Sequence, residues 1–365
     1  MKLLFLLSTL SVSLASVLYP RANNLVPTVS STDTLLTPGG GGTYPRLAHL
    51  ADGSVLGSFT AFSGGKNILT VTRSTDGART FTPWGIVATG TSNINDLDNL
   101  QLVQLPNGSI LATFRNHDKT TANVYTFYRI TACISHDNGQ TWAFISQVDQ
   151  RAASGVNGLW EPFGRISVNG AVQVYYAAEN AQNDQDILMR TSTDNGATWS
   201  AETTVAGATT TGRDGMPACT TFTTPAGAAR LLCVFETTEG TAPLFTVKSV
   251  ESSDDGRTFG SRAQVFVPGG SQNNAGAPFV VTTTAGTLVV SFMTDEDTSA
   301  HTWASGASMK ILTSLSTDPP VWGQKTTVLG ASSFWPGLYS RVDGSGTVVG
   351  CADLNGAQCR SISFA

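Results

Sequence analysis

Charged side chains are scarce in this sequence of 365 residues, at 13% of the chain, and no block of basic residues occurs. With a formal net charge of −5, the protein lacks the basic cluster that would neutralise phosphates, so we expect neither nucleic acid nor a membrane as a partner. Histidine is also scarce. The four histidines do not repeat at the spacing of zinc ligands, and no phosphate-binding loop or nucleophile elbow is present. We therefore expect no metal and no cofactor.

Long apolar runs are absent except at the N-terminus. Lys2 precedes a largely apolar stretch from Leu3 to Leu14, and Ser13-Leu14-Ala15 fits a small-residue cleavage site. We interpret residues 1–15 as a secretory signal peptide, because the stretch is too short to span a membrane. We expect a secreted, extracellular monomer whose single domain covers residues 20–365.

Cysteine is present in an odd number, five residues. Cys219 and Cys233 lie symmetrically about the turn at 225–227, and Cys351 and Cys359 flank the turn at 355–356. Each pair can therefore bridge two adjacent strands, which leaves Cys133 as a buried free thiol. The spacing permits these bridges but does not settle the connectivity.

A turn that combines serine, aspartate, glycine and an aromatic residue recurs along the chain. It reads SHDNGQTW from Ser135, STDNGATW from Ser192 and SSDDGRTF from Ser252, and weaker copies, STDGARTF and STDPPVW, begin at Ser74 and Ser316. The aspartate can accept hydrogen bonds within its own turn, the glycine supplies a positive φ, and the aromatic ring packs beneath. The near-regular spacing of about sixty residues indicates one structural turn in each repeat.

Six strand–turn–strand patterns alternate with these turns, and their turn glycines lie at positions 53, 108, 170, 227, 286 and 346. Glycine turns between alternating apolar residues are the strongest short-range sign of a hairpin. Six four-stranded sheets that must cover one another's faces predict an all-β fold, a six-bladed β-propeller of the sialidase-like kind with antiparallel blades. Only one strand, RSISFA, follows the sixth hairpin, so we expect an N-terminal strand near residues 34–37 to complete the last blade.

The loops that lead into the hairpins and the loops that leave them should meet on one face, opposite the repeated turns. Five lead-in loops contain proline: TYPRL, WEPFG, DGMPA, AGAPF and FWPGLY. The charged and aromatic residues expected on this face include Arg46, Asp96, Asp98, Trp160, Glu161, Phe163, Glu179, Arg213, Asp214, Glu236, Glu239, Asp295, Glu296, Trp335 and Tyr339. Carboxylates beside aromatic rings are typical of glycoside hydrolysis, which needs an acid, a nucleophile or base, and a surface for the sugar.

Two glutamates are the main candidates for catalysis. Glu161 lies between Trp160 and Pro162 at the start of a strand, where partial burial would raise its pKa. Glu236 follows the apolar run LLCVF, where an inner strand would deliver its side chain to the axis. The structural alternative for each is a rim carboxylate in a salt bridge with an arginine such as Arg46, Arg165 or Arg213.

The repeated turns resemble the Asp-boxes of sialidases, and the segments TYPRLAHLADGSVL, GLWEPFGRI, CVFETTEG and FWPGLYSRVDG resemble glycoside hydrolase family 93, the fungal exo-α-1,5-L-arabinanases. The resemblance covers nearly the whole mature chain. It implies a retaining enzyme that releases arabinobiose from the ends of arabinan, a pectin side chain, with Glu161 as acid/base and Glu236 as nucleophile. The candidate substrate-binding residues are Arg46, Asp98, Trp160, Glu179, Arg213, Asp214, Trp335 and Tyr339.

Two alternatives remain open. A sialidase would clamp a substrate carboxylate with three arginines and use a tyrosine nucleophile, roles that Arg46, Arg213 and Tyr339 could fill in part, but the fifth lead-in loop has no arginine. A non-catalytic carbohydrate-binding propeller would not need two converging carboxylates. Separately, Asn107-Gly108-Ser109 is the one glycosylation sequon in the sequence, and it lies at a hairpin tip.

Overall fold

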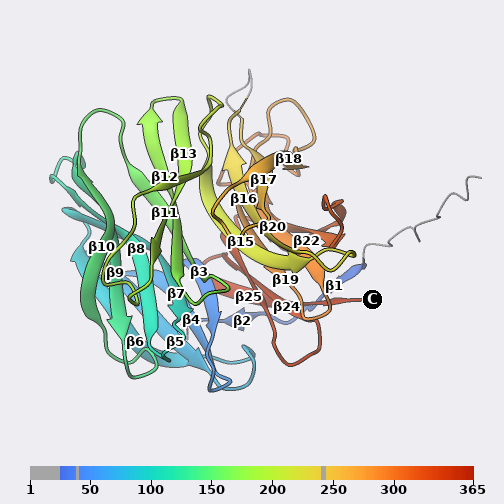
Figure 1. The fold of residues 1–365 in the computed structure, drawn as a ribbon, viewed down its shortest axis with the longest axis horizontal. Helices are drawn as coiled ribbons and strands as arrows, with labels where there is room; N and C mark the ends of the chain where they lie inside the picture. The colour runs from blue at the N-terminus through green and yellow to red at the C-terminus, as the bar shows by residue number, and fades with distance from the viewer. Residues whose placement is uncertain (1–24, 38–40, 240–243) are drawn as a thin grey trace, which may run out of the picture.

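The computed structural model describes residues 25–37, 41–239 and 244–365, and the predicted signal peptide lies outside these ranges. Every regular element in the described ranges is a β-strand (Figure 1). Within the same ranges, no helix is long and apolar enough to cross a membrane. The strands form six antiparallel sheets, which we number as blades 1–6 in chain order.

Blades 1–5 each take four consecutive strands. Blade 1 contains β3 (Thr43–His49), β4 (Val55–Ser63), β5 (Lys66–Ser74) and β6 (Thr82–Thr91), and blade 2 contains β7 (Asn95–Gln104), β8 (Ile110–Lys119), β9 (Tyr125–Ser135) and β10 (Ala143–Ala152). Blade 3 contains β11 (Leu159–Ile166), β12 (Val172–Ala181), β13 (Asp184–Ser192) and β14 (Thr203–Ala206), and blade 4 contains β15 (Gly215–Thr223), β16 (Ala229–Thr237), β17 (Thr246–Ser252) and β18 (Gly260–Phe266). Blade 5 contains β19 (Ala275–Thr282), β20 (Thr287–Thr294), β21 (Ser308–Leu315) and β22 (Gly323–Ala331). Blade 6 combines β23 (Phe334–Ser340), β24 (Val348–Asp353) and β25 (Ala357–Phe364) with β1 (Pro27–Val29) and β2 (Thr34–Leu35).

The six blades close into a ring. The first strand of each blade contacts the first strand of the next, and β23 of blade 6 contacts β3 of blade 1. The short strands β1 and β2 both pair antiparallel with β25, so the N-terminal segment supplies the outer edge of blade 6 (Figure 1). The predicted propeller and its closure by an N-terminal strand are confirmed. The pairing begins at Pro27, earlier than the predicted 34–37. The reason is that two short strands, β1 and β2, pair one after the other along β25.

The repeated turns join the third and fourth strands of their blades. In the turn at Ser135, the serine Oγ donates to Asp137 Oδ1 at 2.8 Å and accepts the N–H of Gly139, while Asp137 accepts the N–H of Thr141. The same bonds recur in the turns at Ser74, Ser192 and Ser252. Ala78 stands in the glycine position of the first turn and keeps a φ of 63°. The bonds are internal to each turn, so these residues hold the blade corners.

Both predicted disulfides are present, Cys219–Cys233 and Cys351–Cys359. Each joins two directly paired residues on adjacent strands of one blade. Cys133 is free and buried, as expected, and burial raises the pKa of its thiol to about 11. A thiol with so high a pKa is protonated and unreactive at neutral pH.

Candidate active site

The first strand of every blade carries a β-bulge near its start, where the register of pairing with the second strand shifts. The residue in each bulge has a φ between 47° and 56° although none is glycine; these residues are Tyr44, Asn99, Glu161, Met216, Ala277 and Trp335. Proline follows this residue in five blades, and these are the prolines shared by the lead-in loops. Because a bulge takes a residue out of the strand ladder, its N–H is free to bind a side chain.

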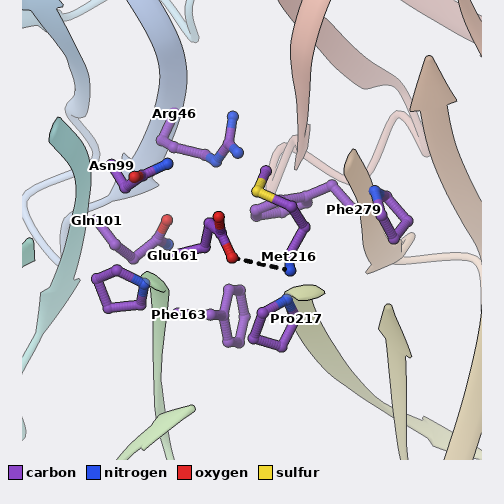
Figure 2. A pocket seen from close by; sticks show the side chains of 10 residues that line it. Arg46, Asn99, Gln101, Glu161, Phe163, Met216, Pro217 and Phe279 are labelled. Atoms are coloured by element: carbon purple, nitrogen blue, oxygen red, sulfur yellow. Dashed lines mark hydrogen bonds between the residues drawn. The ribbon is translucent and has the colours of Figure 1, made fainter. Parts of the chain in front are cut away.

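Glu161 occupies the bulge of β11, and its carboxylate lies among side chains from several blades (Figure 2). Its Oε2 accepts the bulge N–H of Met216, from the next blade, at 3.3 Å. Burial raises the pKa of Glu161, and the positive charges of Arg115 and Arg213 oppose the rise. The site therefore removes this carboxyl from water while keeping two cations that favour its ionised form.

Glu236 reaches the same region from β16, where it pairs with Gly215 of β15. Its Oε2 accepts the bulge N–H of Ala277, again from the next blade, at 2.6 Å. Burial, and after it the negative charge of Glu161, raise the pKa of Glu236 to about 8. The two carboxyl groups are thus coupled, and with this raised pKa Glu236 keeps its proton at neutral pH.

Two glycines leave the space that the Glu236 carboxyl occupies. A Cβ on Gly276 would lie 2.3 Å from Glu236 Oε2, and a Cβ on Gly215 would lie 3.2 Å from Oε1. Both glycines precede the bulge residue of their blade, a position that holds Thr43, Asp98, Trp160 and Phe334 in the other blades. Only blades 4 and 5, which contact Glu236, lack a side chain at this position.

A small cavity, with about 20 Å³ of room for a water-sized molecule, lies against Glu161 (Figure 2). Its lining residues are Arg46, Asn99, Gln101, Glu161, Pro162, Phe163, Met216, Pro217, Pro278 and Phe279. Arg46 donates to the carbonyl oxygens of Pro45 and Trp335, and its guanidinium lies 5.2 Å from the ring centroid of Phe279. Burial lowers the pKa of Arg46 to about 10. Arg46 thus places a positive charge in the cavity that Glu161 lines. The hydrogen-bond acceptors of Arg46 are carbonyl oxygens and not a carboxylate.

Asp98 and Trp160 belong to a network around Arg115. Asp96 and Asp98 accept hydrogen bonds from Arg115 at 3.0 and 3.4 Å, and burial raises the pKa of Asp98. The guanidinium of Arg115 also lies 5.4 Å from the Trp160 ring centroid, and Trp160 packs edge-on against His117. Asp98 is therefore placed to hold Arg115 beside the site, and Trp160 remains partly exposed.

Glu179 and Arg213 form an ion pair of 2.7 Å between blades 3 and 4. Glu179 also accepts the N–H of Gly158 at 2.8 Å, and Arg213 donates to the side chain of Gln185 at 2.9 Å. The charge of Arg213 acts to lower the pKa of both Glu161 and Glu236. Glu179 and Arg213, both predicted as substrate ligands, therefore lie near the two glutamates. The carboxylate of Glu179 already balances the charge of Arg213.

Asp214 and Tyr339, both predicted as substrate ligands, are not among the residues that line the cavity. Asp214 is fully buried, and its two carboxylate oxygens accept from Arg262 at 2.7 and 2.9 Å. Tyr339 is buried in a core cluster and has Asp343 and Arg341 as its electrostatic neighbours, beyond the far end of β23. Trp335 stacks on Tyr44 with ring centroids 4.8 Å apart, and its carbonyl oxygen accepts a hydrogen bond from the cavity residue Arg46.

Other predicted carboxylates on this face are held by neighbouring side chains or backbone. Glu239 binds Lys248 and Arg262, Glu296 binds Lys310 and Lys325, and buried Asp295 accepts the N–H of Asn274. Among the described residues, no group of three or more histidine, cysteine, aspartate or glutamate side chains could hold a metal ion.

Sequence reasoning missed the residues whose backbone holds the glutamates, Met216 and Ala277, and also the cavity residues Asn99, Gln101 and Phe279. The signal that could have found the first two is the proline in the lead-in loops. When the loops are aligned on that proline, the preceding residues become equivalent positions in a ring, and Glu161 is one of them.

No protein-family model and no curated protein matches this sequence. Solved structures do match. An α-L-arabinanase of Penicillium chrysogenum, in complex with arabinobiose, is 20% identical, with a TM-score of 0.67 over 92% of this chain and 98% of that chain. A GH93 α-L-arabinofuranosidase of Fusarium graminearum with arabinobiose is 20% identical, with a TM-score of 0.68 over 91% and 96%. The NanB sialidase of Streptococcus pneumoniae is 10% identical, with a TM-score of 0.59 over 90% and 70%. The chain therefore has the six-bladed propeller fold that these glycosidases share.

Proposed function

We propose that this protein is a secreted glycoside hydrolase that cleaves α-1,5-L-arabinan from chain ends, with retention of configuration, and releases arabinobiose. The observation that carries the proposal is the pair of Glu161 and Glu236. They are coupled carboxyl groups from adjacent blades, each bound by the bulge N–H of the following blade, and Glu161 borders the cavity. Retaining hydrolysis needs two carboxyl groups about 5–5.5 Å apart, one ionised and one protonated.

The proposed substrate class follows from the similarity to solved structures and from the charges around Glu161 and Glu236. Two of the structural neighbours were solved with arabinobiose, which is a neutral disaccharide. A neutral sugar suits this site, because Arg115 and Arg213 are already paired with carboxylates. Trp160 and Trp335 are partly exposed and would supply surfaces for furanose rings.

A sialidase activity fits the site less well. A clamp for a substrate carboxylate would need arginines whose charge is not already matched, and only Arg46 of the three arginines near the pair is bound to carbonyls alone. The tyrosine that could have served as nucleophile, Tyr339, is buried in the core cluster.

The charges favour Glu161 as the nucleophile and Glu236 as the acid/base, the reverse of what the family resemblance implies. Glu161 has two cations nearby, whereas Glu236 faces the negative charge of Glu161 and has only Arg213 to offset it. In this mechanism, the Glu161 carboxylate attacks the anomeric carbon and forms the glycosyl-enzyme. Glu236 protonates the departing oxygen and then takes a proton from the attacking water.

The activity is tested by incubating the protein with linear arabinan, debranched arabinan and a sialoside, followed by sizing of the products. Release of arabinobiose from the arabinans is expected, with no sialic acid from the sialoside. Binding to arabinan without any product would indicate a carbohydrate-binding propeller, and release of sialic acid would indicate a sialidase.

The roles are tested by rescue with azide. Glu161→Ala is expected to form a glycosyl azide of inverted configuration, and Glu236→Ala one of retained configuration while still cleaving substrates with good leaving groups. The opposite pattern would exchange the roles, and full activity in both variants would remove the pair from the mechanism.

A further inference from the structure

The loop that leaves the second strand of blade 5, residues 295–307, brings an indole to the Glu236 carboxyl. A Cβ placed on Gly276 would lie 3.2 Å from ring atoms of Trp303 and 2.3 Å from Glu236 Oε2. The edge of the Trp303 ring and the carboxyl of Glu236 therefore meet over the backbone of Gly276. None of the substrate residues predicted from the sequence lies in this loop.

The loop is anchored at both of its ends. Near its start, the N–H and the hydroxyl of Thr298 both donate to the carbonyl of Asp295. Near its end, Ser332 Oγ donates to the carbonyl of Ser305 at 3.0 Å, which ties the loop to the segment that leads into blade 6. Hydrogen bonds therefore order the backbone on either side of Trp303, and the one from Ser332 ties its loop to a neighbouring segment.

Apolar packing fixes the indole further and leaves part of it uncovered. Trp303 packs against a buried cluster of Tyr44, Met216, Ala277, Met293 and Ala307. Its ring also lies 6.1 Å from that of Phe245, at an angle of 31°. Trp303 is only partly buried in this arrangement, so part of its side chain remains accessible to solvent.

We propose that Trp303 is a specificity-determining residue that packs against the departing sugar, the first arabinose after the cleaved bond. This inference rests on the proposed function and on Glu236 as its acid. The acid must reach the oxygen that joins the two sugars, so a side chain beside it faces the sugar that leaves. The C–H face of a furanose is apolar and packs well on an indole. Gly276, without a side chain, leaves that approach open.

The test compares two substrates that share the arabinobiosyl group and differ in what departs. Arabinotriose loses an arabinose, whereas α-L-arabinobiosyl fluoride loses only a fluoride ion, which cannot contact an aromatic ring. Trp303→Leu keeps an apolar side chain on the cluster and removes the aromatic face. We expect kcat/KM on arabinotriose to fall about tenfold and kcat/KM on the fluoride to stay within about twofold of wild type. Trp303→Phe should recover part of the loss.

The ratio of the two rates within one variant does not depend on the fraction of folded protein, so a loss of stability cannot imitate the effect. Phe144→Ala is the matched control, because Phe144 is a 63% exposed aromatic residue on the outer strand β10 of blade 2. An equal fall on both substrates, or no fall on arabinotriose, would overturn the role of Trp303. A wild-type protein inactive on both substrates would instead refute the proposed function.

Discussion

Replacing Gly276 by alanine tests whether the placement of the Glu236 carboxyl controls activity. The added Cβ would lie 2.3 Å from Glu236 Oε2, closer than any tolerated contact, while Gly276 is not among the residues with positive φ, so its backbone accepts alanine. The carboxyl group, at the end of a flexible side chain, must move. When it moves, it loses the 2.6 Å hydrogen bond from the N–H of Ala277.

The size of the effect follows from that lost bond. A hydrogen bond to a neutral acceptor contributes about 0.5–1.5 kcal/mol, which corresponds to a fall in rate of about two- to tenfold. Folding should be little affected, because the side chain that gives way is a partly exposed one at the site. We therefore expect Gly276→Ala to lose activity on arabinotriose while keeping its thermal midpoint within a few degrees of wild type.

The assay is the initial rate of arabinobiose release, with thermal unfolding measured in parallel. Gly260→Ala is the matched control, since a Cβ on Gly260 meets no atom within 4 Å and its φ is not positive. This control should leave both measurements unchanged. If Gly276→Ala cleaved arabinotriose at the wild-type rate, the contact between its backbone and Glu236 would not matter for activity, and the geometry assigned to the pair would be wrong.

Three further predictions concern the charge, the closure and the surface of the protein. Because the pKa of Glu236 is raised to about 8, its contribution to stability is present below the unfolded value of about 4.3 and is lost as the pH rises through about 8. Between these two pH values, Glu236→Gln should therefore lose less stability than wild type, as measured by denaturant unfolding at several pH values. Identical stability profiles for the two proteins would contradict the raised pKa of Glu236. Deleting residues 27–36 removes β1, β2 and the fully buried Leu36, and should lower the thermal midpoint; a truncated protein that melts like the intact one would refute the closure. Asn107 is exposed at its hairpin tip, so endoglycosidase should lower the mass of the secreted protein without changing its activity. An unchanged mass would mean that the sequon carries no glycan and serves only as a hairpin turn.

The sequence by itself determined the parts of this protein that depend on neighbouring residues. The turns at Ser135, Ser192 and Ser252 are closed by bonds within eight residues, and the hairpins by glycines between two adjacent strands, so their pattern was sufficient to predict six blades. The disulfides followed for the same reason, since Cys219 and Cys233 are partners across one hairpin. The position of Glu236 at the end of an inner strand also followed from the local sequence, because the apolar run LLCVF precedes it.

Only the tertiary structure decided which groups surround each glutamate. The N–H groups that hold Glu161 and Glu236 come from Met216 and Ala277, on different blades, and become available only because each inner strand bulges. The ion pair of Asp214 could not be predicted either, because its partner Arg262 lies 48 residues away in the sequence. Trp303 was missed for a related reason, since its loop meets Gly276 only when the blades pack around the axis. Burial, charge coupling and contacts between blades depend on how distant segments meet in space, and a local pattern does not record that.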